Sequence, residues 1–360
     1  GLSDPAAVTF SPDGRHVLIS SAAGGSNRPL TVYSRRAPDP LFELIENDVH
    51  LDPVSETSTQ KINALASPSD LAVSADGQHV YAISLDQGAV SVFQRSAAAG
   101  SDEITAGEHL EFQQSLFNGQ DGVEGMDAPR YLELSPDPQS AHVYVTSETG
   151  TVAIFQRVVD PNAADFGELS FVGSVQDGES ETDGDTVDGL NGARGMAFDS
   201  AGRHLYVAGA FDAAIAVFER DPTNGTLDWI GEARNGVDFV QGLQGIRGLA
   251  MSSDDQQLFG VSDQADRLVV FQRETDVADP DFGLLAFSQS ISTLVGEQPM
   301  AVAASADGIH VYVASKQSDS ISTFRRETDP GSSAFGTLFP VAQQINQVDG
   351  IEFMDGPRDV

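Results

Sequence analysis

The chain has 360 residues, no cysteine, and 54 acidic against 19 basic side chains, which gives a formal net charge of −35. So negative a surface repels nucleic acid and anionic lipid, and no apolar run approaches the roughly 20 residues of a membrane-spanning helix, so neither nucleic acid binding nor membrane insertion is expected. The charge fits extracellular, cell-surface or periplasmic surroundings, and the absence of cysteine excludes disulfides and thiol chemistry.

One segment recurs along the whole chain. Copies begin near residues 5, 68, 129, 193, 246 and 299, and a further copy opens at Pro357. Self-similarity at such a spacing is the signature of a repeat architecture. We therefore interpret residues 1–360 as one domain of similar units, six of them complete.

Each copy predicts a β-hairpin. The first strand is a short apolar run such as Tyr131–Leu134, and the second is a run such as His142–Thr146. Most copies join the two through Ser-x-Asp-Gly, as at Asp76 and Gly77. Asp-Gly between two apolar runs favours a tight turn, because glycine accepts a positive φ without a Cβ clash.

Two more strands follow in each copy. The third ends in an aromatic residue with an arginine two positions later, as in Phe155 and Arg157. Side chains alternate along a strand, so the aromatic ring and the arginine share one face, and the arginine stem can cover the edge of the ring. The fourth strand is a shorter run such as Glu168–Phe171, after a loop rich in proline, aspartate and glycine.

Four antiparallel strands per unit of this length predict an all-β protein, a β-propeller of four-stranded blades. No segment carries the sustained 3.6-residue apolar period of a helical repeat. Six complete copies and the start of a seventh leave six and seven blades both open.

The repeated Ser-Pro-Asp-Gly-x-His-Val-Tyr-Val pattern, followed by Val-Phe-x-Arg, resembles the YVTN-type repeats of lactonase-like propellers. The resemblance covers nearly the whole chain but lies in framework positions. It implies a site at the central channel, where members that hydrolyse or form lactones use arginines with a histidine or a glutamate. The arginines have candidates in this chain, and Glu124, Glu148 and Glu297 are candidates for the carboxylate.

Arginine occupies one position at the start of the first strand in four copies. These are Arg130, Arg194, Arg247 and Arg358, and the other copies carry Ala6, Ser69 and Met300 there. The first strand of a blade is the innermost, so we expect these arginines at the mouth of the channel. They could pair with acids such as Asp127, Asp188 or Asp355, or bind a carboxylate or phosphate bidentately.

An acidic loop is the candidate metal site. Its carboxylates are Asp177, Glu179, Glu181, Asp183, Asp185 and Asp188. Carboxylates alternating with glycines can surround Ca²⁺ with oxygens, although the run lacks the full EF-hand pattern. A solvated acidic loop without a metal is the alternative.

Acid–base chemistry has few candidates. Five of the seven histidines occupy the same second-strand position, so we interpret them as framework that caps a turn or satisfies a backbone group. Only His50 and His109 lie elsewhere. No Gly-x-Ser-x-Gly segment is present, so covalent hydrolysis is not expected.

The leading interpretation is therefore a β-propeller that binds a protein, a glycan or a small anion, as a structural or binding module of a bacterial surface or secreted protein. The alternative is a lactonase-like enzyme that uses the arginines and a carboxylate at the channel.

Overall fold

The computed structural model describes residues 5–21, 30–35, 42–46, 63–65, 67–95, 110–180, 184–346, 348 and 357. The chain divides into two compact units, one of Gly1–Ser174 with Thr223–Thr226 and the other of Val175–Pro222 with Leu227–Val360. In the described part, six four-stranded antiparallel sheets and one short 3-10 helix, η1 (Asn63–Leu65), account for the regular structure. No helix of that part is long and apolar enough to cross a membrane.

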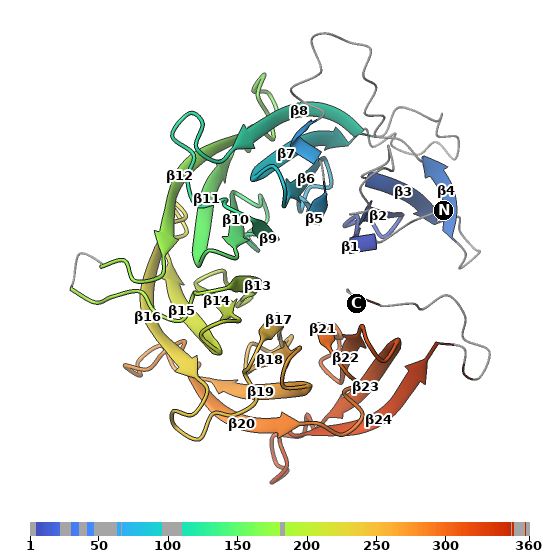
Figure 1. The fold of residues 1–360 in the computed structure, drawn as a ribbon, viewed down its shortest axis with the longest axis vertical. Helices are drawn as coiled ribbons and strands as arrows, with labels where there is room; N and C mark the ends of the chain where they lie inside the picture. Colours follow the sequence, from blue (N-terminus) through green and yellow to red (C-terminus); the bar gives the residue numbers. More distant parts are fainter. Residues whose placement is uncertain are drawn as a thin grey trace. The chain divides into compact units, whose positions relative to one another are not determined.

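We number the sheets as blades one to six in chain order. The strands of each blade neighbour one another in chain order, as Figure 1 shows. Blades one to three contain β1 (Pro5–Phe10), β2 (His16–Ser21), β3 (Leu30–Arg35) and β4 (Phe42–Glu46); β5 (Pro68–Val73), β6 (His79–Ser84), β7 (Ala89–Arg95) and β8 (Leu110–Phe117); β9 (Pro129–Leu134), β10 (His142–Ser147), β11 (Thr151–Arg157) and β12 (Leu169–Gln176).

Blades four to six belong to the second unit. They contain β13 (Ala193–Phe198), β14 (His204–Gly209), β15 (Ala214–Arg220) and β16 (Leu227–Arg234); β17 (Ile246–Met251), β18 (Gln257–Ser262), β19 (Arg267–Arg273) and β20 (Leu285–Ile291); β21 (Pro299–Ala304), β22 (His310–Ser315), β23 (Ser320–Arg326) and β24 (Leu338–Ile345). The prediction of a β-propeller of four-stranded antiparallel blades is confirmed. The start of the copy at Pro357 lies outside the described residues apart from Pro357 itself.

The Ser-x-Asp-Gly-x-His segment forms the predicted hairpin turn, and each of its residues has a distinct role. In blade two the Ser74 hydroxyl donates to Asp76 Oδ1 at 2.5 Å and accepts from the His79 backbone N–H at 3.0 Å. Gly77 has φ +70° and donates its N–H to the Ser74 carbonyl at 2.8 Å. The turn is therefore fixed by local side-chain bonds, which is why the sequence reveals it.

The fourth strands are longer than predicted. β12 begins at Leu169 rather than Glu168 and continues to Gln176, whereas the sequence indicated only Glu168–Phe171. Burial alternates over Leu169–Val172 and not beyond, and the second half of the strand, Gly173–Gln176, has Val175 as its one large apolar residue. Main-chain hydrogen bonds to the neighbouring strand continue beyond the apolar residues that predicted the strand, because backbone hydrogen bonds do not depend on side-chain polarity.

The aromatic residues that end the third strands are core, as predicted. Phe93, Phe155, Phe218, Phe271 and Phe324 are all buried. In the second unit, Phe271 packs with residues of blades four and five in one cluster, and Phe324 packs with residues of blades five and six in another. Sheets within a unit are therefore joined face to face by apolar side chains.

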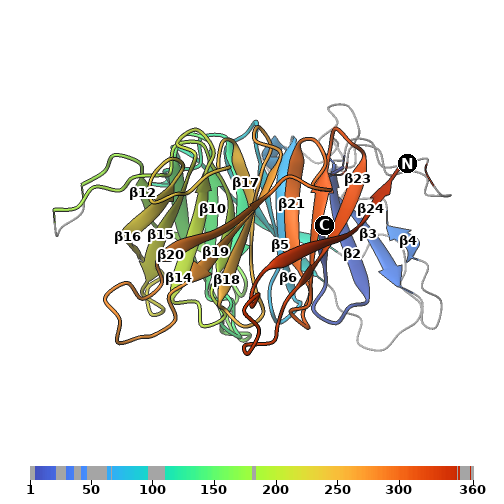
Figure 2. The same cartoon turned by 90° about the horizontal axis from the view of Figure 1, so that it is seen from below.

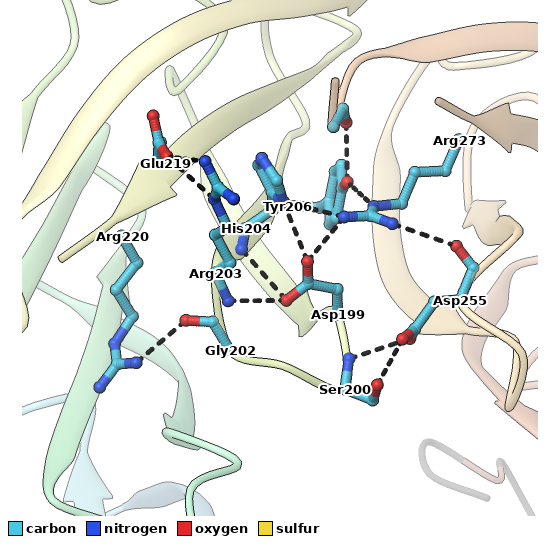
Figure 3. A network of polar contacts seen from close by, with 11 residues as sticks. Asp199, Ser200, Gly202, Arg203, His204, Tyr206, Glu219, Arg220, Asp255 and Arg273 are labelled. Carbon is cyan, nitrogen blue, oxygen red and sulfur yellow. Dashed lines mark hydrogen bonds and ion pairs between the residues drawn. The ribbon is translucent and has the colours of Figure 1, made fainter. Parts of the chain in front are cut away.

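The arginines that follow these aromatics do more than cover ring edges. Arg273 is buried, and its Nε donates to the Tyr206 hydroxyl at 2.7 Å while its Nη2 donates to Asp199 Oδ2 at 2.6 Å (Figure 3). The Tyr206 hydroxyl donates in turn to the Gly283 carbonyl at 2.7 Å. Tyr206 and Asp199 belong to blade four and Arg273 to blade five, so a buried polar network joins the two sheets.

The same network joins blades two and three in the first unit. Arg157 donates to the Tyr81 hydroxyl at 2.7 Å and to Asp76 Oδ2 at 2.6 Å, and Tyr81 donates to the Gly167 carbonyl at 2.9 Å. Burial and the Arg157 charge lower the pKa of His79 to about 4, so this imidazole is neutral near pH 7. The second-strand histidine is thus framework as predicted, and its Nδ1 lies 3.0 Å from Arg157 Nη2.

Candidate functional site

The predicted channel arginines lie on the first strands of three blades. Arg130 is on β9, Arg194 on β13 and Arg247 on β17, and all three are half-buried. Arg358 lies outside the described residues. Arg194 and Arg247 belong to the second unit, where β17 contacts β13 on one side and β21 on the other; Figure 2 shows β17 and β21 in the side view.

A glycine after each of these two arginines lets the first strands approach closely. A Cβ on Gly195 would lie 2.5 Å from the Arg247 carbonyl oxygen, and one on Gly248 would lie 3.1 Å from the Met300 carbonyl oxygen. Only glycine fits the first of these contacts without a shift. Arg194, Arg247 and Met300 therefore occupy one row across β13, β17 and β21.

Two of the arginines pair with a carboxylate from the turn between the second and third strands. Arg247 Nε donates to Asp263 Oδ2 at 2.9 Å, and Arg130 Nε donates to Glu148 Oε2 at 2.9 Å. The corresponding position after β14 is Ala210 in the blade of Arg194. Pairing with an acid was expected, and the partner of Arg130 is Glu148 from the turn of its own blade rather than Asp127 of the entry loop. Asp355 and Arg358 lie outside the described residues.

The remaining candidate carboxylates are separate from these pairs. Glu124 is exposed on the loop before β9, and Glu297 Oε2 accepts from the Gln317 side-chain amide at 2.9 Å. Glu148, by contrast, accepts a hydrogen bond from a predicted arginine, Arg130. Asp263, which contacts Arg247, was not among the candidates, although its place directly after a second strand is visible in the repeat.

Glu133 on β9 was also missed. It is a half-buried acid at a position that is Ala72, Ala197, Ala250 and Ala303 in other blades. Burial raises its pKa to about 7, partly opposed by a hydrogen bond to Tyr131. A carboxylate where the repeat carries alanine is a departure that a comparison of copies could have found.

The acidic loop forms a cluster different from the predicted one. Carboxylate oxygens of Asp177 and Asp188 lie within 4.8 Å of one another and of Asp212, from the turn between β14 and β15. Glu179 and Asp185 are exposed, while Glu181 and Asp183 lie outside the described residues.

A cation already faces this cluster. Arg234 Nη2 donates to Asp188 Oδ1 at 2.6 Å, and Arg234 also bonds to Glu232. Burial and the neighbouring Asp212 and Asp188 charges raise the pKa of Asp177, whereas a hydrogen bond from Leu190 N–H and the Arg234 charge oppose that shift. Calcium binding by this loop stays a prediction, and three carboxylates beside a guanidinium offer fewer free oxygens than the sequence indicated.

Comparison with known proteins relates the chain to lactonases. Residues 180–342 match the family model described as lactonase, 7-bladed beta-propeller, and no curated protein matches the chain. A candidate 6-phosphogluconolactonase from Bacteroides fragilis superposes with a TM-score of 0.69 at 18% identity, over 99% of this chain and 86% of that one. The periplasmic gluconolactonase of Pseudomonas aeruginosa superposes with a TM-score of 0.67 at 21% identity, over 95% of this chain and 88% of that one.

These matches overturn the leading interpretation from the sequence. A binding or structural module without chemistry was preferred because the repeated motif is framework and no catalytic histidine or cysteine was visible. The family match and the lactonase neighbours favour the enzymatic alternative instead. The resemblance to lactonase-like β-propellers that the repeat indicated is confirmed.

Proposed function

We propose that this protein is a lactonase that opens a sugar lactone at the arginine row of the second unit. The observation that carries the proposal is the Arg247–Asp263 pair, 2.9 Å between Nε and Oδ2, with Arg194 on the adjacent first strand. Both arginines and Asp263 lie within residues 180–342, the part of the chain that matches the lactonase family.

The chemistry needs few groups. Asp263 takes a proton from a water molecule as the water oxygen attacks the lactone carbonyl carbon, and the guanidinium groups of Arg247 and Arg194 stabilise the oxyanion that forms. The ring C–O bond then breaks, and the departing alkoxide takes the proton from Asp263. The product is the open-chain hydroxy acid, and no cofactor or redox partner is required.

The proposed substrate class is taken from the names of the structurally similar proteins. The named activities of the matched proteins are on gluconolactone and its phosphorylated form, so we assign a sugar δ-lactone to this chain. A periplasmic or other extracytoplasmic location is part of the same proposal, supported by the periplasmic neighbour and by the net charge of −35.

The test is hydrolysis of glucono-δ-lactone and of its phosphorylated form. Hydrolysis is measured as the release of acid at a rate above the spontaneous one. Asp263→Asn and Arg247→Ala should each lower kcat/KM by about 10²–10³, the usual effect of removing a group that stabilises developing charge or moves a proton. Arg203→Ala removes one exposed cation paired with Glu219 and serves as the control. Wild-type rates equal to the spontaneous rate for both substrates would refute the proposal.

A further inference from the structure

A polar cavity opens on blade five. Its volume is about 680 Å³, and the loop of residues 235–243, before β17, forms one wall, with β19 and β20 opposite. The polar side chains that line it are Asn235, Gln241, Gln244, Arg267, Ser288, Gln289 and Ser290. Phe287 adds an aromatic ring. The cavity thus combines amides, two hydroxyls, one cation and one aromatic surface.

Arg267 breaks the pattern of the other blades. It pairs with Ser262 at the start of the third strand, and the residues in the same register elsewhere are Ala89, Thr151, Ala214 and Ser320. All four are buried and small. Blade five alone of these five places a long cation at this position, and it does so where a cavity is present.

The guanidinium of Arg267 has no hydrogen bond or ion pair with any residue that the structure describes. The nearby acids have other partners: Asp263 accepts from Arg247, and Asp266 Oδ1 accepts from the Gln298 N–H at 2.8 Å. A half-buried guanidinium without an acid is unusual in a chain of net charge −35, in which acids greatly outnumber cations. Its five N–H donors remain available to a ligand in the cavity.

Blade four provides a matched comparison. The loop of residues 177–190, which leads into its first strand β13, has the same hydrogen bonds at its ends as the loop of residues 235–243, which leads into β17 of blade five. Asp177 Oδ1 accepts from the Leu190 N–H as Asn235 Oδ1 accepts from the Leu243 N–H. Gly178 donates to the Val187 carbonyl as Gly236 donates to the Val240 carbonyl, each at 2.8 Å.

These bonds align the two loops residue by residue at their ends. The acids Asp177, Asp188 and Asp212 of blade four correspond to Asn235, Gln241 and Ala265. The cation of blade four, Arg234, is bound by Asp188 and Glu232. At these positions blade four carries acids, one of which forms an ion pair with Arg234. Blade five carries neutral side chains there, so the positive charge of Arg267 has no acidic partner among them.

The same loop displays an aromatic residue at a conformational cost. Phe239 is 91% exposed and has φ +65°, a backbone conformation that residues other than glycine rarely adopt. The equivalent residue of the loop before β9 is Gly122, with φ +82°. A bulky ring held in solvent at a glycine position costs about 1 kcal/mol or more and points to a function for the ring.

We propose that this cavity binds an anionic sugar. The carboxylate or phosphate is held by Arg267, the hydroxyls by the amides of Asn235, Gln241 and Gln244, and the apolar face of the sugar by the ring of Phe287. The cavity is lined by the loop before β17 together with β19 and β20, and none of Arg194, Arg247 and Asp263, which carry the proposed lactone chemistry, lines it. It therefore adds a separate sugar-binding site to the proposed enzyme.

Calorimetric titration of the whole chain with gluconate, glucose 6-phosphate and glucose tests this inference. At least one of the two anions should bind, and glucose should bind about tenfold or more weakly than that anion, because it lacks the charged group. Tighter binding of one anion identifies carboxylate or phosphate as the recognised group. Absence of binding by both anions at about 10 mM, or equal affinity for glucose, would overturn the proposal.

Variants locate the ligand. Arg267→Ala should weaken anion binding about tenfold or more, while Arg203→Ala, which removes a cation elsewhere in the same unit, should leave it unchanged. Gln241→Glu restores an acid at the position of Asp188 and should also weaken binding, which keeps the test valid if Arg267→Ala unfolds. Binding kept in Arg267→Ala but lost in Arg247→Ala would assign the ligand to the first-strand arginines and refute the inference.

Discussion

Arg273 Nη2 lies 2.6 Å from Asp199 Oδ2, although 74 residues separate the two in the chain. Both side chains are buried, and the pair joins blade four to blade five. Burial by itself would raise the pKa of Asp199, but hydrogen bonds from His204 and from backbone amides, together with the Arg273 charge, hold it below its ordinary value. The ion pair is therefore intact at neutral pH.

Removing Arg273 should strongly destabilise the second unit. Arg273→Ala leaves the Asp199 carboxylate buried without its guanidinium, and breaking a buried pair on one side costs about 3–5 kcal/mol of unfolding free energy. Arg203→Ala is the matched control, because its ion pair with Glu219 is about half exposed and should contribute less than about 1 kcal/mol. Urea unfolding of the two variants checks the difference, and equal losses would contradict it.

Gly283→Ala should destabilise through a clash as well as through backbone strain. Gly283 has φ +91°, and a Cβ there would lie 2.4 Å from the His204 ring, which packs edge-on against Phe282. Gly236 has φ +87° with no atom within 4 Å of the added Cβ. Gly236→Ala should cost about 1 kcal/mol from strain alone, and Gly283→Ala about 2–4 kcal/mol. Thermal unfolding measures both, and a smaller loss for Gly283→Ala would disprove the close contact with His204.

Stability should fall as the pH rises through the titration of Glu133. The folded pKa is about 7 and the ordinary value 4.5, so the folded state keeps a proton that the unfolded chain releases between these two values. The stabilising effect of this proton is complete below pH 4.5 and is lost as the pH approaches 7.

Glu133→Gln stays neutral at every pH and should therefore gain stability relative to wild type on going from pH 5 to pH 8, by up to about 3 kcal/mol. Glu111→Gln, which removes a carboxylate at an exposed position on β8, is the matched control. Urea unfolding at the two pH values provides the measurement, and a constant difference between Glu133→Gln and wild type would argue against a protonated carboxyl in the folded state.

Calcium should stabilise an Arg234→Ala variant more than the wild type. The variant loses the cation that bonds to Asp188 and leaves Asp177, Asp188 and Asp212 to repel one another. A metal bound only by the folded state at a hundred times its Kd adds about 2.7 kcal/mol of unfolding free energy. Melting temperatures with Ca²⁺ and with a chelator check this, and Arg203→Ala again controls for the loss of one positive charge. Equal effects of calcium on the melting temperatures of all three proteins would refute a calcium site in this loop.

The repeat by itself determined the fold, the hairpin turns and the buried aromatics. Ser74, Asp76, Gly77 and His79 bond within one turn, so their pattern is local and appears directly in the sequence. Period-2 alternation likewise predicted that Phe155 and Arg157 share a buried face. Local bonds and strand periodicity need no knowledge of how the blades pack, which is why these features could be read from one chain.

Only the tertiary structure decided what the special residues contact. Arg157 reaches Tyr81 across 76 residues, Arg247 pairs with Asp263 rather than with an entry-loop acid, and Arg267 faces a cavity formed by a loop and two strands. Spacing along the chain could not show these relationships, because hydrogen bonds, ion pairs and cavities depend on distances between side chains of different strands and blades. The repeated residues specified the strands and turns of each blade. The packing of one blade on the next determined which of the residues that differ between the repeats lie close together in space.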